Sequence, residues 1–359
     1  MPSEIKAPVL KTAVLGLGRI AWSFHIPQII CHPGFKLAAV VDPLPERLRE
    51  AADKFSPGAC FATCDEMYIK LKPDLVVIAS PTKFHKQQVL QAFEHGCDVF
   101  CDKPLSLSLE ETDEIIGVMN KYGRKLMVYQ PHRVTQEASA IKSILSEGLL
   151  GKIYLIRHSV ASFNRRSDWQ AFKKNGGGML NNSGAHFIDQ LLYLNQSKSS
   201  KISCELRAVA TLGDAEDVVK TVITAENGVI MDLDINMAAA HEVSPWYIAG
   251  SCGAAVFDPE SKEWNLRYFE PAELTRINPQ EGLAAANRSY FNGETIPWKT
   301  KVISNKDFPE IDFYGKCLEY FAGGLPPFVP VSETREVMRV ISECRRAAGC
   351  GSLLWKSVI

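Results

Sequence analysis

The sequence lacks a long hydrophobic run and a net charge, and each absence argues against a class of protein. No apolar stretch approaches the ~20 residues that a membrane-spanning helix needs. The N-terminal segment carries Lys, Glu and two Pro before any apolar run, so it does not resemble a signal peptide. The 40 Lys and Arg nearly balance the 41 Asp and Glu, and the net charge of −1 gives no general attraction to nucleic acid or anionic lipid. We therefore expect neither a nucleic-acid nor a membrane partner, and a cytoplasmic location.

Cysteine is also sparse. The 10 cysteines among 359 residues are fewer than a disulfide-rich scaffold contains. No CxxC motif occurs, and no second pair has zinc-finger spacing, so we expect neither a metal site nor dithiol redox chemistry. Reduced and mostly buried thiols are the simplest interpretation.

The first third of the sequence alternates short apolar segments with helical patterns. We expect strands at Thr12–Leu15, Leu37–Val41, Leu75–Ala79, Asp98–Cys101 and Leu126–Tyr129, and helices at Arg19–Cys31, Glu46–Lys54, Lys86–His95 and Leu109–Lys121. Strands without polar alternation are typical of a parallel sheet covered on both faces. The repetition of strand and helix predicts an α/β fold with a doubly wound parallel sheet of the Rossmann type.

The pattern changes after Tyr129, and we place the domain boundary there, giving residues 1–129 and 130–359. Beyond it we expect helices at Glu137–Ser146, Ile311–Ala322 and Glu333–Ala348, and strands at Ile153–Ala161, Cys204–Ala210, Val218–Thr224 and Val229–Ala238. Asn227-Gly228 predicts a hairpin turn between the last two strands. Strict alternation around Asp232, Asp234 and Asn236 predicts a sheet with one polar face. That polar row favours a solvated or subunit-facing surface over a cation site.

A glycine-rich turn follows the first strand. In Gly16-Leu17-Gly18-Arg19-Ile20-Ala21, the first glycine permits the turn and the second allows close approach of a pyrophosphate. Asp42 ends the second strand, 24 residues after Gly18, where a carboxylate binds ribose hydroxyls and repels a 2′-phosphate. We predict NAD as the cofactor, while Arg47 leaves NADP open.

Three further segments hold the candidate site. Ser80-Pro81-Thr82-Lys83-Phe84-His85 follows the strand at Leu75–Ala79, and Cys101-Asp102-Lys103-Pro104 follows the strand at Asp98–Cys101. Ligands bind beyond the carboxyl ends of strands in an open α/β sheet, so both segments are expected to face the cofactor. The third segment is Gly176–Asp189. From these positions we select Ser80, Pro81, Thr82, His85, Asp102 and Lys103, with Gly16, Gly18, Arg19, Ile20 and Asp42, as cofactor contacts.

With these motifs the sequence resembles the Gfo/Idh/MocA family of NAD(P)-dependent oxidoreductases over nearly its whole length. The resemblance rests on the glycine-rich turn, on Pro81-Thr82 with His85, on Lys103-Pro104, and on Gly176–His186 as a version of GGGxLxDxGxH. It implies a C-terminal α+β domain with an open, mostly antiparallel or mixed sheet, a sugar, sugar-derivative or inositol substrate, and a homodimer or homotetramer formed through that sheet.

The resemblance also implies catalytic roles. Lys103 would position and polarise the reacting oxygen, and His186 would be the general acid/base, which suits an imidazole that titrates near neutral pH. Asn182 stands where family dehydrogenases usually carry Asp, and an amide neither accepts a proton nor stabilises an imidazolium by charge. Asp189 is a candidate to compensate, or else a capping or supporting residue.

The substrate side is expected to be polar and aromatic. His132 follows the strand at Leu126–Tyr129, and Arg166, Asp168 and Trp169 lie in the loop before the glycine run. A stacking aromatic ring with forked donors and acceptors suits a sugar. We therefore predict Lys103, His132, Arg166, Asp168, Trp169, Asn182 and His186 as substrate contacts, the alternative being a solvated loop with an anchored Trp.

Three functions are compatible with this sequence. The first is an NAD-dependent dehydrogenase of CH–OH groups in sugars or inositols. The second is a glycoside-cleaving enzyme that uses tightly bound NAD for a transient oxidation and elimination. The third is a non-catalytic sugar-sensing regulator, which the presence of both Lys103 and His186 disfavours.

Overall fold

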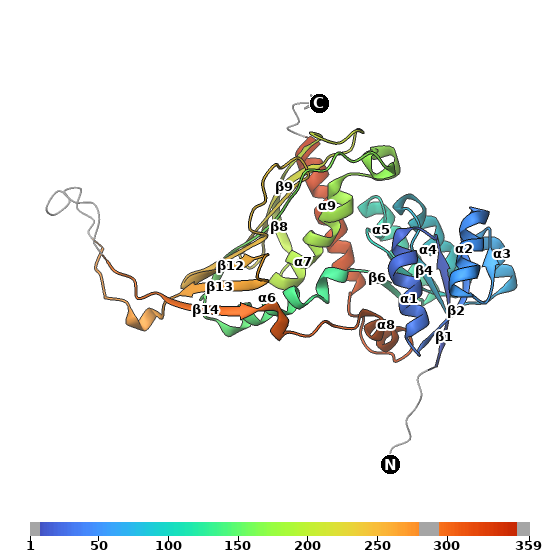
Figure 1. The fold of residues 1–359 in the computed structure, drawn as a ribbon, viewed down its shortest axis with the longest axis horizontal. Helices are drawn as coiled ribbons and strands as arrows, with labels where there is room; N and C mark the ends of the chain where they lie inside the picture. Colours follow the sequence, from blue (N-terminus) through green and yellow to red (C-terminus); the bar gives the residue numbers. More distant parts are fainter. Residues whose placement is uncertain (1–7, 280–293, 350–359) are drawn as a thin grey trace, which may run out of the picture.

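The computed structural model describes residues 8–279 and 294–349, which form two β-sheets with associated helices (Figure 1). The first sheet is entirely parallel. Its strands, in spatial order, are β3 (Cys60–Phe61), β2 (Phe35–Val41), β1 (Leu10–Leu15), β4 (Leu75–Ile78), β5 (Asp98–Cys101) and β6 (Leu126–Val128). This is the expected Rossmann order, in which the chain reverses its direction of progress between β1 and β4.

Helices cover both faces of this sheet, so the doubly wound prediction is confirmed. Around the sheet lie α1 (Ile26–Cys31), α2 (Pro45–Phe55), α3 (Cys64–Lys70), α4 (His85–Glu94) and α5 (Leu109–Tyr122). Val14 and Val77 belong to one apolar core, whereas Leu15 and Ile78 belong to a second core on the opposite face. The helix expected at residues 19–31 begins with a π-helical turn (Ala21–His25) before α1.

The second sheet is mixed and mostly antiparallel, as the resemblance implied. Its spatial order is β14 (Lys299–Ser304), β13 (Glu263–Tyr268), β12 (Gly253–Asp258), β11 (Trp246–Gly250), β7 (Ile153–Ala161), β10 (Ile230–Asn236), β9 (Val218–Ala225) and β8 (Ser199–Arg207). Only the pair β7–β10 is parallel among these described strands. The predicted hairpin turn at Asn227-Gly228 joins β9 to β10.

The bounds of one predicted strand differ in this sheet. We expected a strand at Cys204–Ala210, but β8 begins at Ser199 and ends at Arg207. The carboxylate of Asp217 accepts hydrogen bonds from the backbone N–H groups of Val209, Ala210 and Thr211, each at 2.7 Å. These bonds replace the ladder partners of that segment, and the chain leaves the sheet.

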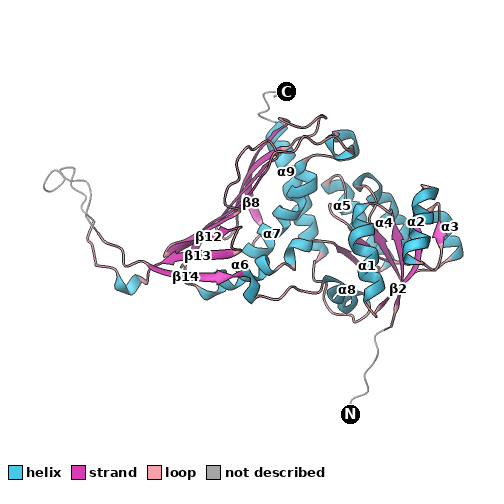
Figure 2. Ribbon diagram, in the orientation of Figure 1, coloured by secondary structure: helices cyan, strands magenta, loops and turns pink. Residues whose placement is uncertain are grey.

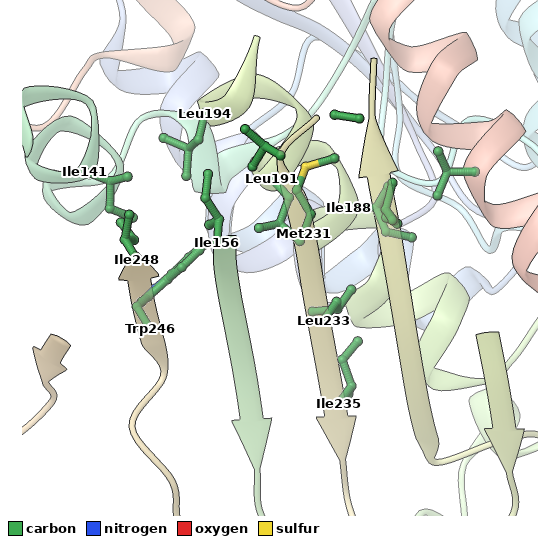
Figure 3. Close-up of a cluster of buried hydrophobic side chains, with 14 of the residues drawn as sticks. Ile141, Ile156, Ile188, Leu191, Leu194, Met231, Leu233, Ile235, Trp246 and Ile248 are labelled. Atoms are coloured by element: carbon green, nitrogen blue, oxygen red, sulfur yellow. The ribbon is translucent and has the colours of Figure 1, made fainter. Parts of the chain in front are cut away.

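Three helices pack on one face of the second sheet: α6 (Gln136–Glu147), α7 (Ala185–Asn195) and α9 (Val331–Gly349). Figure 3 shows Ile188 and Leu191 of α7 against Met231, Leu233 and Ile235 of β10. This core explains the alternation along β10, because the intervening side chains face away from the helices.

The polar row of β10 is occupied by ion pairs. Asp232 receives Arg157 at 2.9 Å and Lys220 at 2.6 Å, and Lys220 also lies 3.6 Å from Asp234. Within residues 8–279 and 294–349, no three His, Cys, Asp or Glu side chains are grouped as metal ligands. No helix of this part of the chain is both long and apolar enough to cross a membrane.

The C-terminal segment crosses back to the first sheet. Helix α8 (Phe313–Phe321) places Phe313, Tyr314 and Phe321 in the same apolar core as Val14 and Val77. The hydroxyl of Tyr314 lies 2.9 Å from Nδ1 of His25. Figure 2 shows α8 beside α1 and shows α7 and α9 between the two sheets. The first core is therefore completed by residues nearly 300 positions away in sequence.

Candidate active site

The glycine-rich turn has the shape that a dinucleotide requires. Gly16 has φ of +86°, and a Cβ there would lie 2.8 Å from the Cα of Ser80, so only glycine fits. A Cβ on Gly18 would meet nothing closer than the Ala79 carbonyl oxygen at 3.9 Å, which leaves space in front of the turn. The Asp42 carboxylate accepts the Leu17 N–H at 2.8 Å and thereby fixes this turn beside the end of β2.

Asp42 is buried, and its two oxygens also receive the Leu44 N–H at 3.0 Å and Arg47 at 3.4 Å. Two carboxylate oxygens offer about four acceptor positions, so capacity remains for a ribose hydroxyl. Arg19, on the other side of the turn, is exposed, and Ile20 packs against the first core. These features fit a bound NAD.

One buried histidine connects the loops that follow β4 and β5. The ring nitrogens of His85 lie 2.8 Å from the Ser80 carbonyl oxygen and 2.9 Å from the Pro104 carbonyl oxygen. Burial lowers the pKa of His85. The Ser80 hydroxyl donates to Gln88 at 2.6 Å, and the Lys103–Pro104 peptide bond is cis. His85 thus links the first loop to the one that carries Lys103, with its ring turned into the protein.

The remaining residues of these loops differ in exposure. Thr82 is buried, whereas Pro81 is exposed at the edge of the sheet. The carboxylate of Asp102 accepts the backbone N–H of Lys103 at 2.9 Å. Both loops lie at the carboxyl ends of neighbouring strands, as the sequence predicted.

Glycines also shape the entry to α7. A Cβ on Gly177 would lie 2.2 Å from the Gln170 carbonyl oxygen, and one on Gly178 would lie 2.1 Å from the Glu216 carboxylate. Glu216 accepts the Leu180 N–H at 3.1 Å, and Arg345 bonds the side chain of Asn181. The chain then makes a π-helical turn (Leu180–Gly184) before α7. These contacts fix the turn that carries Asn182.

Lys103, which follows β5 of the first sheet, contacts Asn182 in the turn before α7. Lys103 Nζ donates to the backbone carbonyl of Asn182 and lies 3.4 Å from its Oδ1. Gln170 Nε2 also donates to that Oδ1, at 3.4 Å. The pKa of Lys103 is lowered to about 8. Burial is the main cause, Asp102 opposes it, and Arg19 and Arg166 add to it. Asn182 therefore presents an uncharged acceptor to the lysine.

The surroundings of His186 define its tautomer. Gln130 Nε2 donates to the Ala185 carbonyl at 3.4 Å, which turns Gln130 Oε1 toward His186 Nδ1 at 3.2 Å. An amide oxygen only accepts, so Nδ1 carries the proton and Nε2 carries the lone pair. Burial and the neighbouring Lys103 lower the pKa of His186 well below its usual value, so the ring is neutral. Among the described residues, Nε2 has no hydrogen-bond partner.

His132, a predicted substrate contact, lies next to His186. It belongs to a short 3-10 turn (Pro131–Arg133) after β6, and its ring centroid is 4.9 Å from that of His186. Burial, followed by the charge of Lys103, lowers the pKa of His132 to about 4. Two neutral imidazoles therefore stand beside one lysine.

Asp189 does not contact His186. Its carboxylate makes a bidentate pair with Arg133, with distances of 2.7 and 2.5 Å, and Glu333 approaches Arg133 at 2.6 Å. Burial disfavours the charge on Arg133, but the two carboxylates outweigh burial and raise the pKa of Arg133. Of the roles considered for Asp189, the geometry matches a supporting one, because its oxygens are committed to Arg133.

The loop before the glycine run supplies the other predicted contacts. Arg166 bonds Gln170 Oε1 and lies 3.8 Å from Asp168. Asp168 also caps a short 3-10 turn (Trp169–Ala171) by accepting the Gln170 N–H at 3.0 Å. The Trp169 side chain is 41% exposed and so is not anchored in the core. Gln170 joins this loop to Asn182.

Gln130 and Gln170 are site residues that the sequence did not single out. Gln130 follows β6 at the same sheet edge as Lys103, so its position was the available signal. Gln170 is the fourth residue after Arg166 in a loop without a recognisable pattern, and nothing in the sequence distinguished it.

The Rossmann sheet and the mixed second sheet are the fold of an NAD-binding oxidoreductase family. Residues 10–130 match the family model described as "Oxidoreductase family, NAD-binding Rossmann fold", and residues 138–256 match the "GFO/IDH/MocA C-terminal domain". The chain therefore belongs to the Gfo/Idh/MocA family, and its Rossmann domain binds NAD.

Characterised relatives are distant. The D-glucoside 3-dehydrogenase of Escherichia coli is 27% identical over 54% of this chain and 56% of its own length. The 2,7-anhydro-N-acetylneuraminate hydratase of Mediterraneibacter gnavus is 24% identical over 51% of this chain and 48% of its own length. The matched region thus spans about half of each relative. The crystal structure of an NAD-binding protein from Listeria innocua has a TM-score of 0.82 at 24% identity and covers 96% of this chain and 98% of its own.

Proposed function

We propose that the protein is an NAD-dependent dehydrogenase that oxidises a secondary alcohol of a sugar, sugar derivative or inositol. The observation that carries this proposal is the pairing of Lys103 with a neutral His186 whose Nε2 is free to accept a proton. Membership of an oxidoreductase family and similarity to a D-glucoside 3-dehydrogenase support it.

The cofactor contacts follow from the turn and the loops. Gly16 and Gly18 allow close approach of the pyrophosphate, Arg19 supplies a cation, and Asp42 accepts from the adenosine ribose. Asp42 disfavours a 2′-phosphate by charge, which favours NAD over NADP. Ser80, Pro81, Thr82 and Asp102 line the nicotinamide side, and Ile20 supports the turn. His85 holds these loops from beneath, so its role is one of positioning.

Bound NAD supplies the hydride acceptor. Lys103 Nζ donates to the reacting oxygen and stabilises the negative charge that develops on it. His186 Nε2 accepts the hydroxyl proton, while Gln130 holds Nδ1–H and fixes the ring. Asn182 holds Lys103 in place through two oxygens and adds no negative charge. His132, Asp168 and Trp169 bind the remaining hydroxyls and C–H faces of the sugar.

The test is a screen of NADH formation against polyols, aldoses, sugar phosphates and glycosides, followed by two variants. Lys103→Ala and His186→Ala should each lower kcat/KM by at least about 100-fold, because each loses a group that acts in proton transfer or charge stabilisation. Calorimetry should show NAD affinity within about threefold of wild type. Near-normal turnover in both variants would refute the assignment.

Similarity to a hydratase favours one second candidate, glycoside cleavage by transient oxidation and elimination. His186 would then remove protons and Lys103 would stabilise the negative charge on the oxygen, while the hydride returns from the cofactor to the sugar. Net NADH production supports the dehydrogenase, whereas cleavage of a glycoside without net NADH supports the second candidate.

Assembly and domain division remain proposals. We infer a homodimer or homotetramer through the face of the second sheet that α7 and α9 leave uncovered. Tyr154, Val256 and Val302 are exposed on strands of this sheet, which supports an interface there. The division at Tyr129 follows from the end of β6, the last strand of the first sheet.

A further inference from the structure

Three charged side chains act on Lys103. Arg19 and Arg166 are both close enough to lower the pKa of this lysine, and Asp102 is the one carboxylate that acts in the opposite direction. The carboxylate of Asp102 already accepts the backbone N–H of Lys103. The charged groups that act on this lysine are therefore two arginines and one aspartate.

Bound NAD accounts for only one of these cations. Arg19 directly follows Gly18, so the pyrophosphate of the proposed cofactor neutralises it. Arg166 lies on the loop at the other side of Lys103, and Asp168 approaches it only at 3.8 Å with a carboxylate that is half exposed. The Arg166 side chain is only 24% exposed, and the long distance to Asp168 makes this pair weak, so the guanidinium keeps donors for an anion.

A continuous set of hydrogen bonds places Arg166 relative to the reacting groups. Arg166 Nη1 donates to Gln170 Oε1, Gln170 Nε2 donates to Asn182 Oδ1, and that same oxygen lies 3.4 Å from Lys103 Nζ. The guanidinium is thus held two side chains away from the catalytic lysine.

The uncharged amide of Asn182 also favours an anionic ligand. An aspartate here would add a negative charge between Lys103 and Arg166 and would repel an anionic ligand. Asn182 keeps the acceptor geometry and removes that charge, which leaves a site whose electrostatics favour a negative substituent.

We propose that the substrate is an acidic sugar derivative, whose carboxylate or phosphate binds Arg166 while its reacting hydroxyl lies between Lys103 and His186. This inference rests on the proposed dehydrogenase function. A planar guanidinium forms paired hydrogen bonds with either anion, so the shared chemistry is an anionic oxygen group. The charge-assisted bonds also fix the ring so that one hydroxyl faces His186.

The experiment compares the wild type with two variants on matched substrates. Arg166→Gln removes the guanidinium, and Lys174→Gln removes an exposed positive charge from the same loop and serves as the control. The probes are D-glucose, D-glucuronate and D-glucose 6-phosphate, assayed for NADH formation and for binding by calorimetry in the presence of NAD.

We expect an acidic probe to have a higher kcat/KM than glucose with the wild type. Arg166→Gln should raise KM for that probe by about tenfold to a hundredfold and change kcat less, since a hydrogen bond to a charged group is lost. Lys174→Gln should change KM less than about twofold. Preference for glucuronate or for the phosphate identifies the anion.

Three outcomes separate the hypotheses. If glucose is oxidised as well as the acidic probes, or if Arg166→Gln affects all three equally, the acidic-substrate proposal is overturned and the dehydrogenase stands. If no probe yields NADH but the acidic probes bind more weakly to Arg166→Gln than to wild type, the anion site stands and the dehydrogenase is overturned. If binding is also unchanged, both are overturned.

Discussion

At the scale of single residues, the site depends on how protein groups set the charge of Lys103. Its ammonium is bonded to two oxygens of Asn182 and lies beside two neutral imidazoles. Burial, assisted by two arginines and opposed by Asp102, brings its pKa to about 8. Only the protonated lysine polarises an oxygen, so loss of this proton should lower the activity.

We predict that kcat/KM declines as pH rises above about 8, since the lowered pKa of Lys103 means that the ammonium loses its proton in that range. Initial rates between pH 6 and 10 measure this limb. Lys103→Arg keeps a positive charge throughout this range, so any residual activity should lack the limb. A profile that still rises at pH 10 in the wild type would contradict the assigned role.

Several residues of the site were predictable and others were not. Asp42 and Lys103 follow the ends of strands, so their positions pointed to the cofactor side, whereas the catalytic roles of Lys103 and His186 came from the resemblance to the family. Gln130 and Gln170 act through hydrogen bonds formed only in the folded chain. A neutral amide has no spacing rule, and its partner depends on tertiary packing.

At the scale of secondary-structure elements, a buried ion pair joins the turn after β6 to two helices. Arg133 contacts Asp189 of α7 and Glu333 of α9, and the Arg133 and Asp189 side chains are almost completely inaccessible to solvent. Because Arg133 directly follows His132, this pair also fixes the turn that enters the cleft.

We predict that Asp189→Asn lowers the free energy of unfolding by about 3–5 kcal/mol, because a buried guanidinium loses its charged partner. Glu333→Gln should cost less than about 1 kcal/mol, since the Glu333 side chain is 48% exposed. Urea unfolding followed by circular dichroism measures both. Equal losses of unfolding free energy in the two variants would show that burial does not determine the contribution of these ion pairs to stability.

The same scale shows where sequence patterns failed. The Val/Ile/Leu-rich strands of the first sheet were found because both of their faces are buried. Strands β11 to β14 were missed because glycines and charged residues interrupt them, and their pairing partners lie in distant segments. The end of β8 depended on the Asp217 carboxylate, which no local pattern predicts.

At the scale of the whole molecule, α7 and α9 lie between the two sheets (Figure 2), and α8 packs into the core of the first sheet. Tyr314 of α8 is buried among residues of the first sheet and bonds His25. Burial lowers the pKa of His25 to about 4, so this histidine is neutral at physiological pH.

We predict that Tyr314→Ala destabilises the protein by about 3–5 kcal/mol, because it leaves a cavity in the first core. Amide exchange should increase in β1 and β2, and NAD affinity should fall because the glycine-rich turn follows β1. Leu325→Ala, at an exposed position just after α8, is the control and should change stability less than about 0.5 kcal/mol. Unchanged exchange in β1 and β2 would show that α8 does not support that sheet.

The return of α8 also affects synthesis of the chain. A ribosome releases the first sheet long before residues 313–321 are translated, so the part of the sheet's apolar core that α8 covers stays exposed meanwhile. The nascent N-terminal half must therefore avoid aggregation until its last covering helix appears. Slowing translation upstream of α8 is expected to increase its demand for chaperones.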